Sequence, residues 1–424
     1  MAVVTVSGAS GHVIPVTVNG GQAISLASSF AGLMGGAVSG GPGSIGAGSS
    51  FAASVGGGYS FNGSSGTSYF VGDSATESSA VVLNATASSS GATLDVLVGT
   101  GGLTYQGGAA GGNIIIGGGT NTVQLGSGNT TVASGAGNST IVLGSGTGTI
   151  LSDGTDLIVG STGNASIVTN SANTTIIGGS GYTAINDTFG TNTSVIGGTG
   201  DSYILGGLSS SYTLSGNATV ASGVADTVTA SGNTTIFGAN GGSYFMSGTG
   251  SLLFVGGAAG SSTVTAGSNA TIFGGASSTV SFNNGVGIAG AGNETLNGAA
   301  ASSALTLFGS ASPSSSVSLV GGSGSDTLVA GSGSTTLTGG AGNNEFVISG
   351  SATNNSANIT ISDFGSSAGN LVGLFGYGAN QVTDAINSQK NVGGNTVITL
   401  HDSTTVTFTN VASLSNNGQI FGAG

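Results

Sequence analysis

The chain has 424 residues, of which 87 are Gly, and only 4% of its residues are charged. Lys and Arg together number 1, which excludes nucleic acid and anionic lipid surfaces as main partners, because both are bound through many such cations. The formal net charge of −13 is spread thinly, and the absence of Cys excludes disulfides and thiolate metal sites.

Residues 1–94 lack a strict repeat, and we expect them to form an N-terminal cap or assembly module. Apolar and polar residues alternate around residues 4–6 and 14–18, which is typical of strands. Residues 22–34 have the apolar spacing of a short helix. The N-terminus lacks a basic region followed by a continuous apolar segment, so we expect no cleavable signal peptide. No segment is long and apolar enough to predict a membrane-spanning helix.

Residues 95–350 repeat a phrase of glycines, an Asn or Thr, and a pair of β-branched residues, as in NTVQLGSGN, TTVASGAGN and STIVLGSGT from Asn121. One apolar position recurs every nine residues and then slips by one; its members are Val123, Val132, Ile141, Ile150, Val159, Ile167, Ile176 and Ile185. Short β-branched segments favour strands and the Gly-rich segments favour tight turns. Two phrases would complete one coil of about 18 residues, so the sequence predicts an all-β fold, a parallel β-solenoid.

The second half of the array keeps the rule at eight-residue spacing, as at Val220, Val228 and Ile236. Aromatic residues enter here, and we expect them to fill the core or cover a face; they are Phe237, Phe254, Phe273 and Phe282. Residues 351–424 change character and predict a β-rich C-terminal cap. Its expected strands lie near residues 359–364, 371–377 and 395–408, with a hairpin at residues 402–403.

At Gly321 the phrase becomes GGSGSDTLV, which matches the GGxGxDxUx nonapeptide. Residues 321–424 therefore resemble the C-terminal region of RTX proteins, whose parallel β-roll binds calcium and which type I secretion exports. The resemblance implies a secreted bacterial protein, extracellular or at the cell surface, that leaves through an ABC-transporter apparatus without a cleaved signal. It also implies that the Asp at position six of the nonapeptide ligates calcium.

Most repeats depart from that pattern, because position six is neutral; its occupants include Thr130, Ser139, Gly148, Ala165, Thr174 and Thr183. Calcium takes six to eight oxygen ligands. One weak calcium site remains, in which Asp326 would pair with Asn344 in the next coil, helped by Glu345. Otherwise the Asp only caps a turn, so the expected cofactor is none, or calcium at low occupancy. Position five instead predicts a ladder of turn side chains along the coil axis, formed by Asn129, Asn138, Thr147, Asp156, Asn164 and Asn173.

The sequence predicts no enzyme, because its acids are scattered and catalysis of the hydrolase or lyase type needs paired carboxylates or a base. Asp153 and Asp156 are the only close pair in the array, and two turn residues are the simpler interpretation. His12 and His401 lie at opposite ends of the sequence and are too few for a zinc site.

The leading hypothesis is an extracellular structural protein that assembles with itself into a filament, surface layer or biofilm-matrix element. Its partners would be copies of the same chain and the type I secretion apparatus, and cell-surface polysaccharide is a further partner that we consider. One alternative is a calcium-dependent RTX surface-layer protein or adhesin. A minor alternative is an ice-binding solenoid, which Thr130–Thr131 and Thr174–Thr175 suggest, although regular outward Thr-x-Thr rows are not visible in the sequence.

Overall fold

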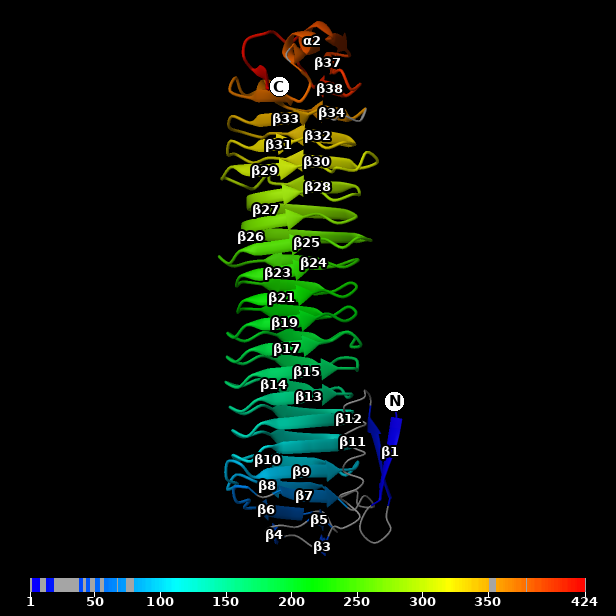
Figure 1. The fold of residues 1–424 in the computed structure, drawn as a ribbon, viewed down its shortest axis with the longest axis vertical. Helices are drawn as coiled ribbons and strands as arrows, with labels where there is room; N and C mark the ends of the chain where they lie inside the picture. Colours follow the sequence, from blue (N-terminus) through cyan, green and yellow to red (C-terminus); the bar gives the residue numbers. More distant parts are fainter. Residues whose placement is uncertain are drawn as a thin grey trace. The chain divides into compact units, whose positions relative to one another are not determined.

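The structure, a computed structural model, describes residues 2–7, 13–18, 38–40, 43–45, 50–53, 57–66, 68–73, 80–350, 356–378 and 380–423. The fold is nearly all β, with 51% strand and 3% helix, and forms a parallel β-solenoid of about 15 turns, which confirms the predicted fold class (Figure 1). The helix expected at residues 22–34 lies outside the described residues. The chain divides into two compact units, residues 1–218 and 219–424.

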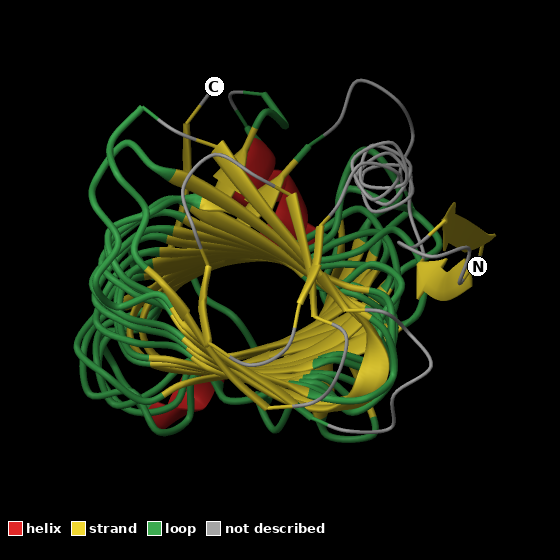
Figure 2. Ribbon diagram, turned by 90° about the horizontal axis from the view of Figure 1, so that it is seen from below, coloured by secondary structure: helices red, strands yellow, loops and turns green. Residues whose placement is uncertain are grey.

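In unit 1 each coil supplies one strand to sheet A and one to sheet B, and turns join the two layers (Figure 2). Strands of sheet A pair in parallel in the order β3 (Val38–Gly40), β5 (Ser50–Ala53), β7 (Ser68–Asp73), β9 (Thr93–Val98), β11 (Gly112–Gln124), β12 (Thr130–Val142), β13 (Gly148–Ser152), β15 (Ala165–Thr169), β17 (Thr183–Asn186) and β19 (Ser202–Leu205). Strands of sheet B pair in the order β4 (Gly43–Ile45), β6 (Gly57–Phe61), β8 (Val81–Asn84), β10 (Leu103–Gln106), β11, β12, β14 (Leu157–Val159), β16 (Thr175–Ile177), β18 (Ser194–Ile196) and β20 (Ser211–Leu214). The long strands β11 and β12 run through both sheets.

The β-branched residues of the phrase form the core of unit 1, as predicted, with one correction. Ile167, Ile176 and Ile185 are at most 2% exposed, but Ile158 (0% exposed), not Val159, fills the place between Ile141 and Ile176. The slip of one residue therefore occurs earlier than expected, because the turn before β14 is one residue shorter.

Glycines recur because successive turns of unit 1 approach each other closely. A Cβ placed on one turn glycine of each coil would come within 2.0–2.3 Å of the carbonyl oxygen of the coil before; these glycines are Gly128, Gly146, Gly163, Gly181, Gly200 and Gly216. No side chain fits at such a distance, so backbone stacking selects glycine here.

Parallel pairing in unit 1 begins before residue 95, where we expected the array to start. β7 pairs with β9 and β9 pairs with β11, so the described strands from β3 to β8 already belong to the solenoid. The number of residues between these strands varies, which hides the period, although inward positions such as Tyr59 and Phe61 are buried. β1 (Ala2–Ser7) and β2 (Val13–Val18) form the expected strands as an antiparallel pair, and β2 lies against β11 and β12.

Unit 2 repeats the arrangement, and its sheets are again called A and B; β21 (Ala218–Ala221) lies at the boundary between the units. Strands of its sheet A pair in the order β23 (Thr234–Phe237), β25 (Leu252–Val255), β26 (Ser261–Phe273), β27 (Ser277–Ile288), β29 (Leu305–Phe308), β31 (Thr327–Val329), β33 (Glu345–Ser349), β35 (Leu371–Phe375) and β39 (Ile420–Ala423). Strands of its sheet B pair in the order β22 (Thr227–Ala230), β24 (Ser243–Met246), β26, β27, β28 (Glu294–Asn297), β30 (Ser316–Val320), β32 (Ser334–Thr338), β34 (Asn358–Ile361) and β38 (Thr405–Phe408).

The last part of unit 2 forms the predicted cap. β36 (Lys390–Val392), β37 (Asn395–Thr399) and β38 pair antiparallel, beside the 3-10 helix η2 (Phe364–Ser366) and the helix α2 (Gln381–Asn387). The expected hairpin joins β37 to β38, and Ser403 adopts a φ of 66° in its turn. The cap thus ends the parallel pairing of sheet B with an antiparallel layer.

Candidate functional site

The residues of the predicted calcium site lie in neighbouring coils of unit 2, before or in β31 and β33. Asp326 is buried, and its Oδ1 and Oδ2 each accept a 2.7 Å hydrogen bond, from Leu305 N and from Gly322 N. Asn344 Oδ1 accepts from Asp326 N at 2.9 Å. Glu345 is half-buried in β33, beside Thr327 of the previous coil. Both carboxylate oxygens of Asp326 are therefore engaged by backbone amides.

Asn370 extends this column of turn side chains, and the sequence analysis did not include it. Its Oδ1 accepts from Asn344 N at 2.9 Å. The side chains of Asp326, Asn344 and Asn370, in three successive coils, therefore each accept from a backbone N–H at the start of the equivalent strand one coil earlier. In the described part of the chain, no group of three or more His, Cys, Asp or Glu residues is placed to hold a metal ion. These side chains provide hydrogen-bond acceptors for backbone N–H groups that would otherwise be buried without a partner.

The ladder of turn side chains in unit 1 follows the same principle. Asn129 Oδ1 accepts from Thr147 N at 2.9 Å, and Asn164 Oδ1 accepts from Tyr182 N at 3.0 Å, each one coil away. These two side chains bind the backbone of the next coil, so the contacts along the coil axis run from side chain to backbone. Asp156 lies outside this ladder, because it accepts from Ser139 N in the interior at 2.8 Å.

Asp153 and Asp156, the close acidic pair, are bound to different groups. Asp153 Oδ1 accepts from Asn170 Nδ2 at 2.9 Å, whereas Asp156 Oδ2 accepts from Ser152 Oγ at 2.7 Å. Burial raises the pKa of Asp156, against the opposing effect of its hydrogen bonds. Both side chains link neighbouring segments, as the interpretation of two turn residues expects.

A buried polar cluster surrounds Asp187 in unit 1. Asp187 is 0% exposed, and its carboxylate accepts hydrogen bonds from four hydroxyl groups, those of Thr169, Thr193, Ser210 and Tyr212. Four donors on one carboxylate satisfy its acceptor sites without a cation. No sequence signal identified this cluster, because its members come from three coils.

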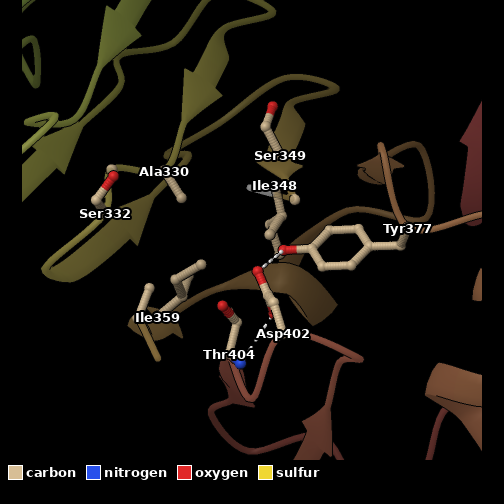
Figure 3. Close-up of a pocket in the computed structure, with 11 residues that line it drawn as sticks. Ala330, Ser332, Ile348, Ser349, Ile359, Tyr377, Asp402 and Thr404 are labelled. Carbon is tan, nitrogen blue, oxygen red and sulfur yellow. Dashed lines mark hydrogen bonds between the residues drawn. The ribbon is translucent and has the colours of Figure 1, made fainter. Parts of the chain in front are cut away.

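A cavity of about 400 Å³ lies beneath the cap of unit 2, between the last coils and the β37–β38 hairpin (Figure 3). Tyr377 Oη donates to Asp402 Oδ2 at 3.2 Å, and Thr404 N donates to Asp402 Oδ1 at 3.0 Å. Burial, together with the charge of Asp402, raises the pKa of the Tyr377 hydroxyl. Both oxygens of Asp402 are bound, so this geometry joins the hairpin to the segment before α2 and supplies no free base.

The outward positions of sheet B in unit 2 form a regular row of hydroxyl side chains. Nine successive strands place a Thr or Ser in register, with none of them buried. We call this row the hydroxyl column; it comprises Thr227, Ser243, Thr263, Thr279, Thr295, Ser318, Thr336, Thr360 and Thr407. The hydroxyl column is a single row, because the outward position two residues later is mixed and holds Phe245, Asn297 and Val320 in three of these strands. Regular outward Thr-x-Thr rows are therefore not present in these nine strands.

The outward positions of sheet A in unit 2 form an apolar row. Seven successive strands place an apolar side chain in register, and Phe237 and Phe273 are 47% and 40% exposed. We call this row the apolar column; it comprises Phe237, Val255, Phe273, Ile288, Phe308, Val329 and Val347. Phe254 and Phe282 are buried instead, so the four aromatic residues divide between the core and a face, as predicted.

Comparisons with known proteins add no assignment to these surfaces: no protein-family model matches the chain, and neither does any curated protein or solved structure. Within the described ranges, no helix has the length and apolar character needed to cross a bilayer.

Proposed function

We propose that this chain is a secreted structural protein that associates with copies of itself into a filament, surface layer or matrix. The observation that carries the proposal is the apolar column of unit 2. Monomeric proteins rarely leave a contiguous apolar surface of this kind exposed. A second copy is the occupant that we propose for it.

Burial of the apolar column would favour association strongly. Full burial of an exposed Phe, Val or Ile side chain contributes about 1.5–3 kcal/mol. Two members of the column are exposed and five are half-buried, so each of the seven would add a part of this value. Charge would oppose the contact little, because Glu345 is the only charged residue at an outward position of strands β23 to β33 in sheet A. Proteins that avoid edge and face association usually place charges at such positions.

The first coils of unit 1 offer a second means of association. Among the described residues, β3 pairs only with β5 and β4 pairs only with β6, so each has a partner on one side. Unpaired strand edges accept further strands. Export by the type I apparatus is part of the proposal and rests on the resemblance of residues 321–424.

The test compares purified wild type with a Phe237→Ser/Phe273→Ser double variant, by electron microscopy and light scattering over a range of concentrations. We expect assemblies from the wild type and dispersed molecules from the double variant. Phe245→Ser is the matched control, because Phe245 is also 47% exposed but lies in sheet B, outside the apolar column. Circular dichroism verifies that each variant is folded. Dispersed wild type at every concentration, or unchanged assembly of the double variant, contradicts the proposal.

A second candidate function is ice binding, and the hydroxyl column favours it. Thr263 and Thr265, like Thr336 and Thr338, also form Thr-x-Thr pairs that face outward. Thermal hysteresis of the wild type, lost in Thr279→Tyr, would support this function. No hysteresis in the wild type excludes it.

A further inference from the structure

A cavity of about 570 Å³ opens at one edge of sheet B in unit 2, away from the apolar column. Its floor is apolar and its rim is aromatic and polar. The residues that the argument uses are Met246 and Phe282 on the floor, and Phe245, Thr265, Asn283 and Asn297 around it.

The cavity exists because two consecutive coils have shortened turns. β26 and β27 run through both sheets, and their connections at residues 267–269 and 283–284 are shorter than those of the coils before and after, at residues 247–251 and 298–304. Across the register shift between Ala266 and Asn269, β27 has one residue fewer than β26. Two short turns between two longer ones leave a notch in the edge.

The side chains of the notch combine an exposed aromatic face with unused polar groups. Phe245 is 47% exposed, whereas Met246 and Phe282 are 1% and 2% exposed. Asn297 Oδ1 accepts from Ala299 N at 3.0 Å, and its Nδ2 has no hydrogen-bond partner among the described residues. The side chains of Asn283 and Thr265 likewise have no hydrogen-bond partner among the described residues. The notch therefore offers amide and hydroxyl groups beside a ring.

No ionic group lines this cavity. Glu294 is the only Asp, Glu, Lys, Arg or His between residues 227 and 325, and its side chain is buried and does not line the notch. A charged ligand would lose its hydration there without gaining a counter-charge. The fitting ligand is neutral, rich in hydroxyl groups and apolar on one face.

We propose that the notch binds a sugar ring of a neutral polysaccharide. The C–H face of the ring would stack on Phe245, and the ring hydroxyls would hydrogen-bond to Asn283 and Asn297. The volume lies within the range of small-molecule sites, which bind by an apolar wall and a few placed polar groups. Phe245, Thr265, Ser281 and Asn297 are consecutive members of one outward row of sheet B, so the aromatic ring and the polar side chains of the notch lie next to one another. This site is independent of the self-association proposed above.

The test measures binding of neutral hexasaccharides of glucose, mannose, galactose and xylose by isothermal titration calorimetry, with polygalacturonate as the anionic probe. We expect at least one neutral probe to bind and polygalacturonate not to bind. We expect Phe245→Ser to weaken that binding by about tenfold or more, the size of one good aromatic contact, and Phe245→Tyr to retain it. Asn283→Ala should weaken it as well.

Phe237→Ser is the matched control, because it removes an equally exposed ring from the other sheet. Loss of glycan binding in Phe245→Ser with retention in Phe237→Ser supports the site. The proposal is overturned if no neutral probe binds, if polygalacturonate binds better, or if Phe245→Ser binds as the wild type does. Phe245→Ser is scored in both tests, as the control for assembly and as the loss variant for glycan binding, so failure of one proposal is distinguishable from failure of the other.

Discussion

The phenol of Tyr212 donates a 2.9 Å hydrogen bond to Oδ2 of Asp187, which lies 25 residues earlier, and neither side chain is exposed. Tyr212→Phe removes this donor from a buried carboxylate and leaves the shape of the ring unchanged. Hydrogen bonds to charged groups contribute about 1.5–3 kcal/mol, and we expect a loss near the lower end because three other donors remain. Urea unfolding measures the loss. Tyr203→Phe is the control, since Tyr203 is 40% exposed, and an equal effect of both changes would contradict the prediction.

The close stacking of turn glycines predicts that Gly163→Ala destabilises the protein. Its Cβ would lie 2.0 Å from the carbonyl oxygen of Gly146, so the coils must separate locally. Overpacking of this kind costs about 1–3 kcal/mol, which thermal unfolding detects. Gly58→Ala is the control, because nothing lies within 4 Å of its Cβ. The stacking argument fails if Gly163→Ala is as stable as Gly58→Ala.

Glu294 predicts a pH-dependent stability. Its Oε2 accepts from Gly290 N at 2.8 Å, and its buried Oε1 has no hydrogen-bond partner in the part of the chain that the structure describes. Burial raises the pKa of Glu294 from 4.5 to about 7. The folded state then holds the proton more tightly than the unfolded state does, so the stabilisation is complete below pH 4.5 and is lost as the pH rises through about 7.

Thermal unfolding of the wild type and of Glu294→Gln between pH 4 and pH 8 checks this. The wild type should lose stability relative to the variant across that range, since Gln does not titrate. Parallel curves for the two proteins would show that Glu294 titrates normally in the folded state.

Calcium is expected to contribute little to folding, because backbone amides already occupy both oxygens of Asp326. The unfolding temperature of the wild type should be the same in excess EDTA and in millimolar calcium. Asp326→Asn should lower the free energy of unfolding by about 1–3 kcal/mol, equally in both conditions, through the lost acceptor of Gly322 N. A calcium-dependent difference that is present in the wild type and absent in Asp326→Asn would instead establish the weak calcium site.

The sequence predicted the coil correctly wherever one strong apolar residue marks each strand, as at Ile167 and Ile185. Val159 was assigned to the inward position in place of Ile158, because these two adjacent β-branched residues fit the pattern equally well. Only the length of the preceding turn determines which of them faces the core. The start of the coil before residue 95 was also missed. Turns of unequal length remove the period there, although the inward positions stay apolar.

The surface columns could not be found by spacing for the same reason. Thr263 and Thr279 are in register, and so are Thr295 and Ser318, although the numbers of residues between them differ. A row that is straight in space is therefore irregular in the sequence. The cluster at Asp187 and the contact of Asn370 with Asn344 were hidden likewise, since both depend on which turns stack.

In unit 1 the strands from β5 to β18 pair in parallel with their counterparts one coil before and one coil after, so a whole coil is a replaceable part. Ala165 and Thr183 occupy equivalent places in successive coils. Excision of residues 165–182 would bring β17 beside β13 with the same inward and outward pattern. Duplication or deletion of the gene segment for one coil could thus lengthen or shorten the protein while preserving its cross-section. The number of coils is therefore less constrained than the sequence of each coil, which must match its two neighbours.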